Sequence, residues 1–292
     1  MSTEKRNENF MLKQSRYSKG KKNVKQYSKN NASKKSGSGK NSYNAYYKKN
    51  DDGFQPKSNG KSNYGKKKYP SKSKGYPKKN AQKPSIKIAF LGGLNEIGKN
   101  ITLVECENDI IIIDCGMAFP DGDMLGVDLV IPDFTYIEQN ADRVKGIILT
   151  HGHEDHIGGL PFLLSKVNVP IYGTPLTLGL VGNKLKEHSL YNQSQLNVIN
   201  AGQSIKLGCM KIDFIHVNHS IPDAVAFAIH TPGGTIVHTG DFKIDCTPIT
   251  GDMIDLSSFA RVGDEGVLAL LSESTNAERP GYTPTERTVS DS

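Results

Sequence analysis

Three histidines and an aspartate lie within six residues near the middle of the chain, in His151-Gly152-His153-Glu154-Asp155-His156. The apolar run at 146–150, which is typical of a buried strand, comes directly before them. Side chains diverge at a strand end, so His151 and His153 can face one point while Asp155 and His156 reach a second point nearby. Imidazole and carboxylate suit zinc or manganese and need no thiolate. The pattern predicts two divalent metal ions, with zinc expected and manganese as the alternative.

Two residues later in the chain also stand at predicted strand ends. His219 follows a strand expected at 210–217, and Asp241 follows one expected at 234–239. A carboxylate at Asp241 could bridge two metals, which hydrolases hold about 3.5–4 Å apart to clamp the attacking and leaving oxygens. Asp114 likewise ends an apolar strand, where packing alone does not explain a carboxylate. These residues complete the candidate site.

The elements that must position this site are short strands broken by amphipathic helices. Further strands are expected at 86–91, 101–106, 110–114, 170–172, 203–207, 224–230 and 266–271, and helices near 134–140, 159–166 and 175–187. Hairpins lie between some of these strands, which does not suit a pure parallel sheet. The alternation predicts a mixed α/β sandwich.

The charge of the chain divides near residue 84. Residues 1–84 hold 24 of the 37 basic and 4 of the 30 acidic side chains, a formal net charge of +20, and 85–292 carry −13. The first segment is rich in Lys, Asn, Ser and Tyr and has few large aliphatic side chains, so it cannot offset an ordering cost of roughly 1–2 kcal/mol per residue. We therefore expect a disordered basic tail. Its charge and tyrosines favour RNA binding, and a solvated linker or a protein contact is the alternative.

The sequence excludes several classes of protein and site. A secretory signal requires an apolar run of about 7–15 residues after the N-terminal charges, and the sequence has none there. A membrane span requires about 18 consecutive apolar residues, and the sequence contains no such stretch. The four cysteines are far apart, which predicts reduced thiols in a cytoplasmic protein and no cysteine zinc site (Cys106, Cys115, Cys209 and Cys246).

Other polar features have simpler explanations than a site. The glycine-rich run at 92–98 lacks the spacing of a phosphate-binding loop, so we expect a turn. Four further histidines are expected to be packed or surface side chains, of which the last is the least certain because it lies near Asp241 (His188, His216, His230 and His238).

The motifs, in this order and spacing, resemble those of the metallo-β-lactamase superfamily: Asp114, the six-residue histidine motif, His219 and Asp241. Local sequence narrows the resemblance to bacterial ribonuclease J, at 92–100, 219–223, 238–243 and 274–281. The resemblance covers about residues 85–292. It implies an αββα sandwich joined to an inserted β-CASP domain.

The resemblance also implies a role for each site residue. His151, His153 and His219 would hold one metal. Asp155 and His156 would hold the second, and Asp241 would bridge, so that Asp155 and Asp241 are the expected catalytic carboxylates. Asp114 would orient metal-site side chains rather than bind directly.

Domain boundaries follow from the same resemblance. Residues 85–271 would be the first part of the catalytic domain and 272–292 the start of a β-CASP domain. The sandwich would then be incomplete, because the remaining ligand histidine and a 5′-phosphate pocket of the family would lie beyond Ser292, and the chain would be a fragment of low activity. The chain also has Glu273 where the family usually has aspartate.

The implied activity is metal-dependent hydrolysis of RNA, from the 5′ end and internally, in RNA processing and decay. RNA is the expected partner, with a homo-oligomer and other RNA-decay or ribosome-associated proteins as further partners, and no membrane. Two alternatives stay open: another hydrolase of this fold acting on a thioester or lactam, and a non-catalytic RNA-binding protein. The basic tail argues against the first, because a small substrate has no use for a polycation.

Overall fold

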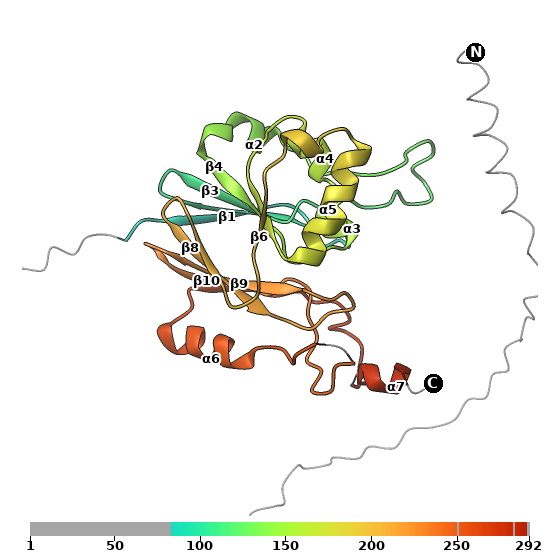
Figure 1. Ribbon diagram of the computed structural model, residues 1–292, viewed down its shortest axis with the longest axis vertical. Coiled ribbons are helices and arrows are strands. Elements are labelled where there is room, and N and C mark those ends of the chain that lie inside the picture. Colours follow the sequence, from blue (N-terminus) through green and yellow to red (C-terminus); the bar gives the residue numbers. More distant parts are fainter. Residues whose placement is uncertain (1–82, 250, 283, 291–292) are drawn as a thin grey trace, which may run out of the picture. The chain divides into compact units, whose positions relative to one another are not determined.

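The computed structural model describes residues 83–249, 251–282 and 284–290 (Figure 1). The basic tail expected at 1–84 lies almost wholly outside these residues. The described chain forms two β-sheets that pack face to face, with helices on the outer side of each (Figure 1). The predicted αββα sandwich is therefore confirmed.

The first sheet has six strands in the order β1-β2-β3-β4-β5-β6. The first three are antiparallel, and β3 to β6 are parallel. Helices cover one face of this sheet and the second sheet covers the other, which explains the continuous apolar runs of its central strands. Its strands are β1 (Ile86–Gly92), β2 (Ile101–Cys106), β3 (Asp109–Ile113), β4 (Val144–Ile148), β5 (Ile171–Gly173) and β6 (Leu196–Val198).

The second sheet has five strands in the order β11-β10-β9-β8-β7. All neighbouring pairs are antiparallel except β10 and β11, which are parallel. Its strands are β7 (Ser204–Leu207), β8 (Met210–His216), β9 (Val225–Thr231), β10 (Gly234–His238) and β11 (Ala269–Leu271).

Three apolar cores hold the layers together. One lies between the two sheets and contains Ile111, Ile148, Phe214 and Phe227. A second lies between the first sheet and its helices, and a third lies between the second sheet and α6. The helices are α2 (Thr135–Gln139), α3 (Glu154–Ile157), α4 (Leu160–Leu164), α5 (Pro175–Glu187), α6 (Leu256–Glu265) and α7 (Glu286–Ser290), with 3₁₀ turns at Ala141–Arg143 and Tyr191–Gln193. Within the described residues, no helix combines the length and apolar character that crossing a membrane requires.

Most predicted elements are present, and the hairpin and α5 are confirmed within a residue. Strand β4 ends at Ile148, two residues earlier than expected, so Thr150 lies in the loop that leads to the histidine motif. Strand β6 and helices α3, α6 and α7 were not predicted from the sequence. Helix α6 begins after Asp255, whose carboxylate accepts a hydrogen bond of 3.0 Å from the backbone N–H of Ser258.

Glu105 on β2 is a buried carboxylate balanced by three neighbours. Its oxygens lie 2.7 Å from Arg143 Nη2, 2.9 Å from Lys87 Nζ and 2.8 Å from the Tyr136 hydroxyl. Burial opposes the charge of Glu105, but hydrogen bonds from Arg143, Lys87 and Tyr136 hold its pKa at about 2, below the ordinary 4.5. This cluster ties β1 and β2 to α2 and the turn before β4.

Glu105→Gln should lower the free energy of unfolding at pH 7 by about 1–2 kcal/mol, because it leaves Arg143 without its carboxylate. A carboxylate with a lowered pKa stabilises the fold above its unfolded pKa, and this contribution disappears as the pH falls from about 4.5 towards 2. Urea unfolding at pH 7 and pH 3 should therefore show a smaller difference between variant and wild type at pH 3. The control is Glu138→Gln, which breaks an exposed pair with Lys166 and should cost about 0–0.5 kcal/mol. An equal effect of Glu105→Gln at both pH values would contradict this account.

Candidate metal centre

The expected site residues gather where several strands end at one edge of the sandwich. Asp114 follows β3 directly, and the histidine motif follows the neighbouring parallel strand β4. His219 comes from the segment after β8, and Asp241 from the turn after β10. The first sheet thus supplies one part of the site and the second sheet supplies the other.

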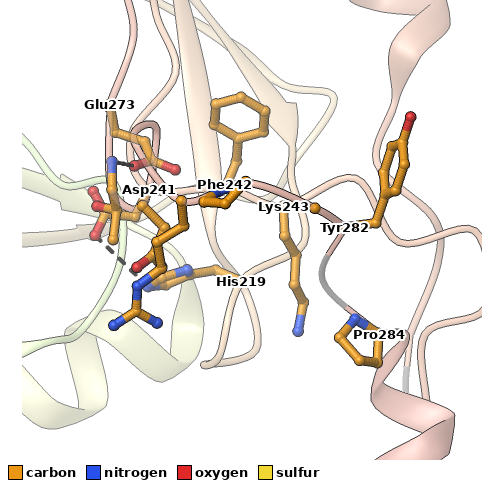
Figure 2. Close-up of a pocket in the computed structure, with 12 residues that line it drawn as sticks. His219, Asp241, Phe242, Lys243, Glu273, Tyr282 and Pro284 are labelled. Atoms are coloured by element: carbon orange, nitrogen blue, oxygen red, sulfur yellow. Dashed lines mark hydrogen bonds and ion pairs between the residues drawn. The ribbon is translucent and has the colours of Figure 1, made fainter. Parts of the chain in front are cut away.

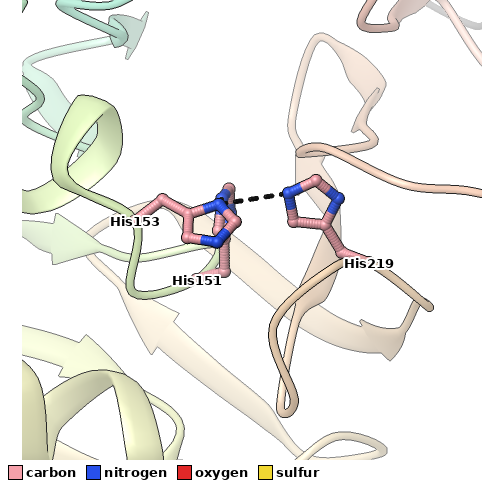
Figure 3. Close-up of side chains that lie close together, drawn as sticks. All are labelled: His151, His153 and His219. Carbon is pink, nitrogen blue, oxygen red and sulfur yellow. Dashed lines mark hydrogen bonds between the residues drawn. The ribbon is translucent and has the colours of Figure 1, made fainter. Parts of the chain in front are cut away.

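Three histidines form the first cluster. His151 Nε2 lies 3.1 Å from His153 Nδ1, which lies 3.2 Å from His219 Nε2 (Figure 3). A tetrahedral zinc with Zn–N bonds of about 2.0–2.1 Å requires nitrogens about 3.3–3.4 Å apart. Three ring nitrogens at nearly this spacing fit one such ion.

A second cluster shares His151 with the first and adds His156 and Asp241. One possible ligand atom from each of these three residues lies within 4.8 Å of the others. Asp241 Oδ2 is 3.5 Å from His156 Nε2 and 3.8 Å from His219 Nε2, so this carboxylate reaches both clusters. Asp155 Oδ2 also lies 3.5 Å from His156 Nε2. The structure therefore brings all six expected ligands together, and their binding of metal stays a prediction.

Asp114 faces the opposite nitrogen of His156. Its Oδ2 is 2.7 Å from His156 Nδ1, and it accepts hydrogen bonds from Thr150 N at 2.8 Å and Thr150 Oγ1 at 2.7 Å. The side chain of Asp114 is only 2% exposed, and both of its oxygens accept hydrogen bonds. This geometry favours the orienting role that the sequence suggests for Asp114.

The shifted pKa values of His151 and Asp241 favour the protonation states in which both side chains can bind a metal. Burial and, after it, the charge of His156 lower the pKa of His151 to about 2, so the ring is neutral. Burial disfavours the Asp241 carboxylate, but the hydrogen bond and charge of His156, together with His151, hold its pKa at about 2. Burial also opposes protonation of His156, yet Asp114 and Asp241 raise its pKa to about 10. A metal at His156 Nε2 must therefore displace a proton.

Sequence reasoning missed three residues beside the clusters. Thr150 contacts Asp114 and lies directly before the histidine motif, and that adjacency is a usable signal. Asn100 Nδ2 lies 3.2 Å from Asp155 Oδ2 and 3.1 Å from His156 Nε2, although nothing in the glycine-rich run before it predicts this. His238, which the sequence left as a packed side chain, accepts a hydrogen bond of 3.1 Å from Gly240 N and so shapes the turn that presents Asp241.

The other polar features lie apart from the clusters. His188 packs 5.5 Å from the Phe162 ring, His216 Nε2 is 3.0 Å from Asp252 O, and His230 Nε2 is 2.9 Å from Asp213 Oδ2. The run at 92–98 forms a bend in which Gly93 N donates to Glu96 Oε1 at 3.0 Å.

A cavity of about 610 Å³ opens beside His219 and Asp241 (Figure 2). Residues after β10 and after β11 form its walls, and they include two cations and an exposed aromatic ring (Lys243, Arg279 and Tyr282). Glu273, which replaces the usual aspartate, also lines it. The cavity thus places two cations and two carboxylates, Asp241 and Glu273, beside the candidate metal centre.

Comparison with known proteins agrees with this geometry. Residues 94–271 match the sequence family described as the metallo-beta-lactamase superfamily. The chain is 50% identical over 207 residues to Ribonuclease J 1 of Streptococcus pyogenes, covering 71% of this chain and 37% of that protein. It is 48% identical over 213 residues to Ribonuclease J2 of Bacillus subtilis, covering 73% and 38%. The chain thus spans less than two fifths of the length of these relatives. By this match, the chain belongs to the metallo-β-lactamase superfamily and, within it, to the ribonuclease J family.

Proposed function

We propose that this protein is a metal-dependent ribonuclease that hydrolyses RNA phosphodiester bonds from the 5′ end and also internally. The observation that carries the proposal is the convergence of two histidine clusters on the Asp241 carboxylate. It is supported by about 50% identity to proteins named ribonuclease J. Zinc is the expected metal, and cytoplasmic RNA processing and decay is the expected setting.

Each candidate ligand has a role in this proposal. His151, His153 and His219 would hold one ion, His156 and Asp155 the other, and Asp241 would bridge them. When bound, two divalent cations supply Lewis acidity and activate a water at neutral pH. Asp114 fixes the ring of His156 through Nδ1, so that Nε2 keeps its direction.

The cavity beside the centre suits a polyanion. Arg279 lines it, as does Lys243, which pairs with Glu286, and cations of this kind neutralise phosphates along a nucleic-acid backbone. Tyr282 presents an exposed ring on which an unpaired base could stack.

A cleavage assay tests the proposal. The protein, expressed from its natural reading frame, is incubated with 5′-monophosphorylated and 5′-hydroxyl RNA, with Zn²⁺, with Mn²⁺ and with chelator. We expect metal-dependent cleavage that chelator abolishes. RNA binding without cleavage under every condition would favour a binding protein, and turnover of a lactam or thioester alone would favour the other hydrolase class.

We further propose that the basic segment at 1–84 binds RNA, because the acidic remainder, at a formal −13, repels a polyanion. Deleting it should weaken RNA affinity without changing cleavage at saturating RNA. Each lost phosphate contact should reduce the slope of log K against log salt by about 0.7 for a single strand. A salt titration of RNA affinity for both proteins measures this, and equal slopes would exclude a role for the segment. A homo-oligomer and contacts with other RNA-decay or ribosome-associated proteins belong to the same proposal.

A further inference from the structure

The hydroxyl of Thr150 lies between the two metal-binding clusters. Its Oγ1 is 2.7 Å from Asp114 Oδ2, 3.0 Å from His151 Nδ1 and 3.4 Å from His156 Nδ1. Thr150 is fully buried, at 0% exposure. One side chain therefore contacts the histidine shared by both clusters and the carboxylate that holds His156.

The hydrogen-bond directions follow from the donors available. A carboxylate only accepts, so the single Thr150 hydroxyl proton goes to Asp114, which is both nearer and charged. The hydroxyl oxygen must then accept from His151 Nδ1–H. This fixes the neutral tautomer of His151 in which Nε2 carries the lone pair, and Nε2 is the nitrogen that faces His153.

The methyl group of Thr150 contacts the second sheet. A Cβ atom added to Gly240 would lie 3.0 Å from Thr150 Cβ and 3.1 Å from Thr150 Cγ2, so the two residues are in close contact. Gly240 also has a φ of +58°, a backbone conformation that favours glycine. Thr150 therefore packs against the turn that presents Asp241. Its backbone N–H also donates to Asp114 Oδ1 at 2.8 Å, and its carbonyl accepts from Val225 N at 2.9 Å.

We propose that Thr150 is a positioning residue whose hydroxyl couples the two metal sites, by holding His151 and the Asp114–His156 pair in the orientations that direct both Nε2 atoms into the centre. This inference rests on the proposed function of the clusters as a metal centre. It assigns the coupling to one hydroxyl group rather than to general packing.

The test compares Thr150→Val with Thr150→Ser in metal-binding titrations of the whole protein with Zn²⁺ and with Co²⁺, whose absorption reports ligand geometry. Thr150→Val keeps the shape and removes the hydroxyl, so metal affinity should fall about 10–100-fold at both sites, as when other outer partners of metal-bound histidines are removed. Thr150→Ser keeps the hydroxyl and should bind within about threefold of wild type with the same Co²⁺ spectrum, since it keeps the partner of both histidines. The control is Thr177→Val, because Thr177 is also fully buried but its hydroxyl accepts from Thr174 at 2.9 Å rather than bonding a cluster residue.

The outcomes separate the inference from the proposed function. A drop in melting temperature without a change in metal affinity for Thr150→Val, as expected for Thr177→Val, would overturn the coupling role. Thr150→Ser binding as weakly as Thr150→Val would also overturn it, because the methyl contact with Gly240 would then be what matters. If Thr150→Val fails to fold, Thr150→Ser still tests the inference, because weak metal binding by a variant that keeps the hydroxyl would overturn it. A wild-type protein that binds neither metal would overturn the proposed function and the inference with it.

Discussion

Replacing His151 and His153 together by alanine should abolish metal binding at the first cluster and reduce RNA hydrolysis by at least about 10³-fold. The cluster offers three ring nitrogens within one coordination sphere, and the double variant leaves only His219. Zinc held by four ligands binds with about 10–16 kcal/mol, so losing two ligands removes several kcal/mol. Because His151 also contributes to the second cluster, that site should lose affinity as well.

Elemental analysis of the purified protein measures the effect. Asp241→Asn should be comparably damaging, since a neutral amide cannot bridge two cations. His230→Ala is the matched control, because His230 pairs with Asp213 and contacts neither cluster. Metal content unchanged in the double variant, with the fold intact by circular dichroism, would disprove the ligand assignment.

The second large effect is expected from Gly116→Ala, because the backbone of this glycine packs directly against the backbone of the histidine motif. A Cβ atom there would be 1.6 Å from Asp155 O and 2.2 Å from Asp155 C, and 2.8 Å from Asn100 N. These are backbone atoms, so the clash cannot be relieved by turning a side chain. Backbone hydrogen bonds join Cys115 and Gly116 to both neighbouring segments. Gly116 N donates to Asn100 O at 2.9 Å, and Cys115 N donates to His156 O of the histidine motif at 2.8 Å.

Gly116→Ala should therefore lower the free energy of unfolding by at least about 3 kcal/mol and reduce metal content at the second cluster, which contains His156. Gly179→Ala is the control: Gly179 is exposed on α5, a Cβ there meets no atom within 4 Å, and alanine should stabilise the helix by about 0.5–1 kcal/mol. Urea unfolding of both variants decides the point. Wild-type stability and metal content in Gly116→Ala would contradict the close approach.

The sequence predicts those parts of the fold that depend on local pattern. The apolar runs of β3 and β4 and the pattern of α5 are read from adjacent residues, and the polar Asp114 directly after β3 marks the end of that strand. Helix α6 was missed although Leu256, Phe259 and Val262 lie at helical spacing and Asp255 caps the helix. Of these, Phe259 and Val262 pack against the second sheet, a contact that the local pattern does not reveal.

The same limit applies to the site. The residue types in the histidine motif suffice to predict a metal centre. The distant His219 and Asp241 are found from their positions at predicted strand ends, and the resemblance adds their roles. Which carboxylate faces which nitrogen depends on the register between strands far apart in sequence, as for the 2.7 Å contact of Asp114 with His156. Adjacency to the histidine motif marks Thr150 in the sequence, but the atoms that its hydroxyl contacts are given only by the structure.

The division of the site between two sheets has a consequence for how the protein is made. His153 and His219 are 66 positions apart in the chain, and the two sheets must dock before their nitrogens can meet. Such distant contacts form late in folding, because the loop between them must be closed first. At synthesis rates of about 5–20 residues per second, Asp241 leaves the ribosome several seconds after His151. In the nascent chain, His151 and His153 are therefore exposed before Asp241, the proposed bridging carboxylate, has been synthesised. The centre can be completed only once β10 has joined the second sheet.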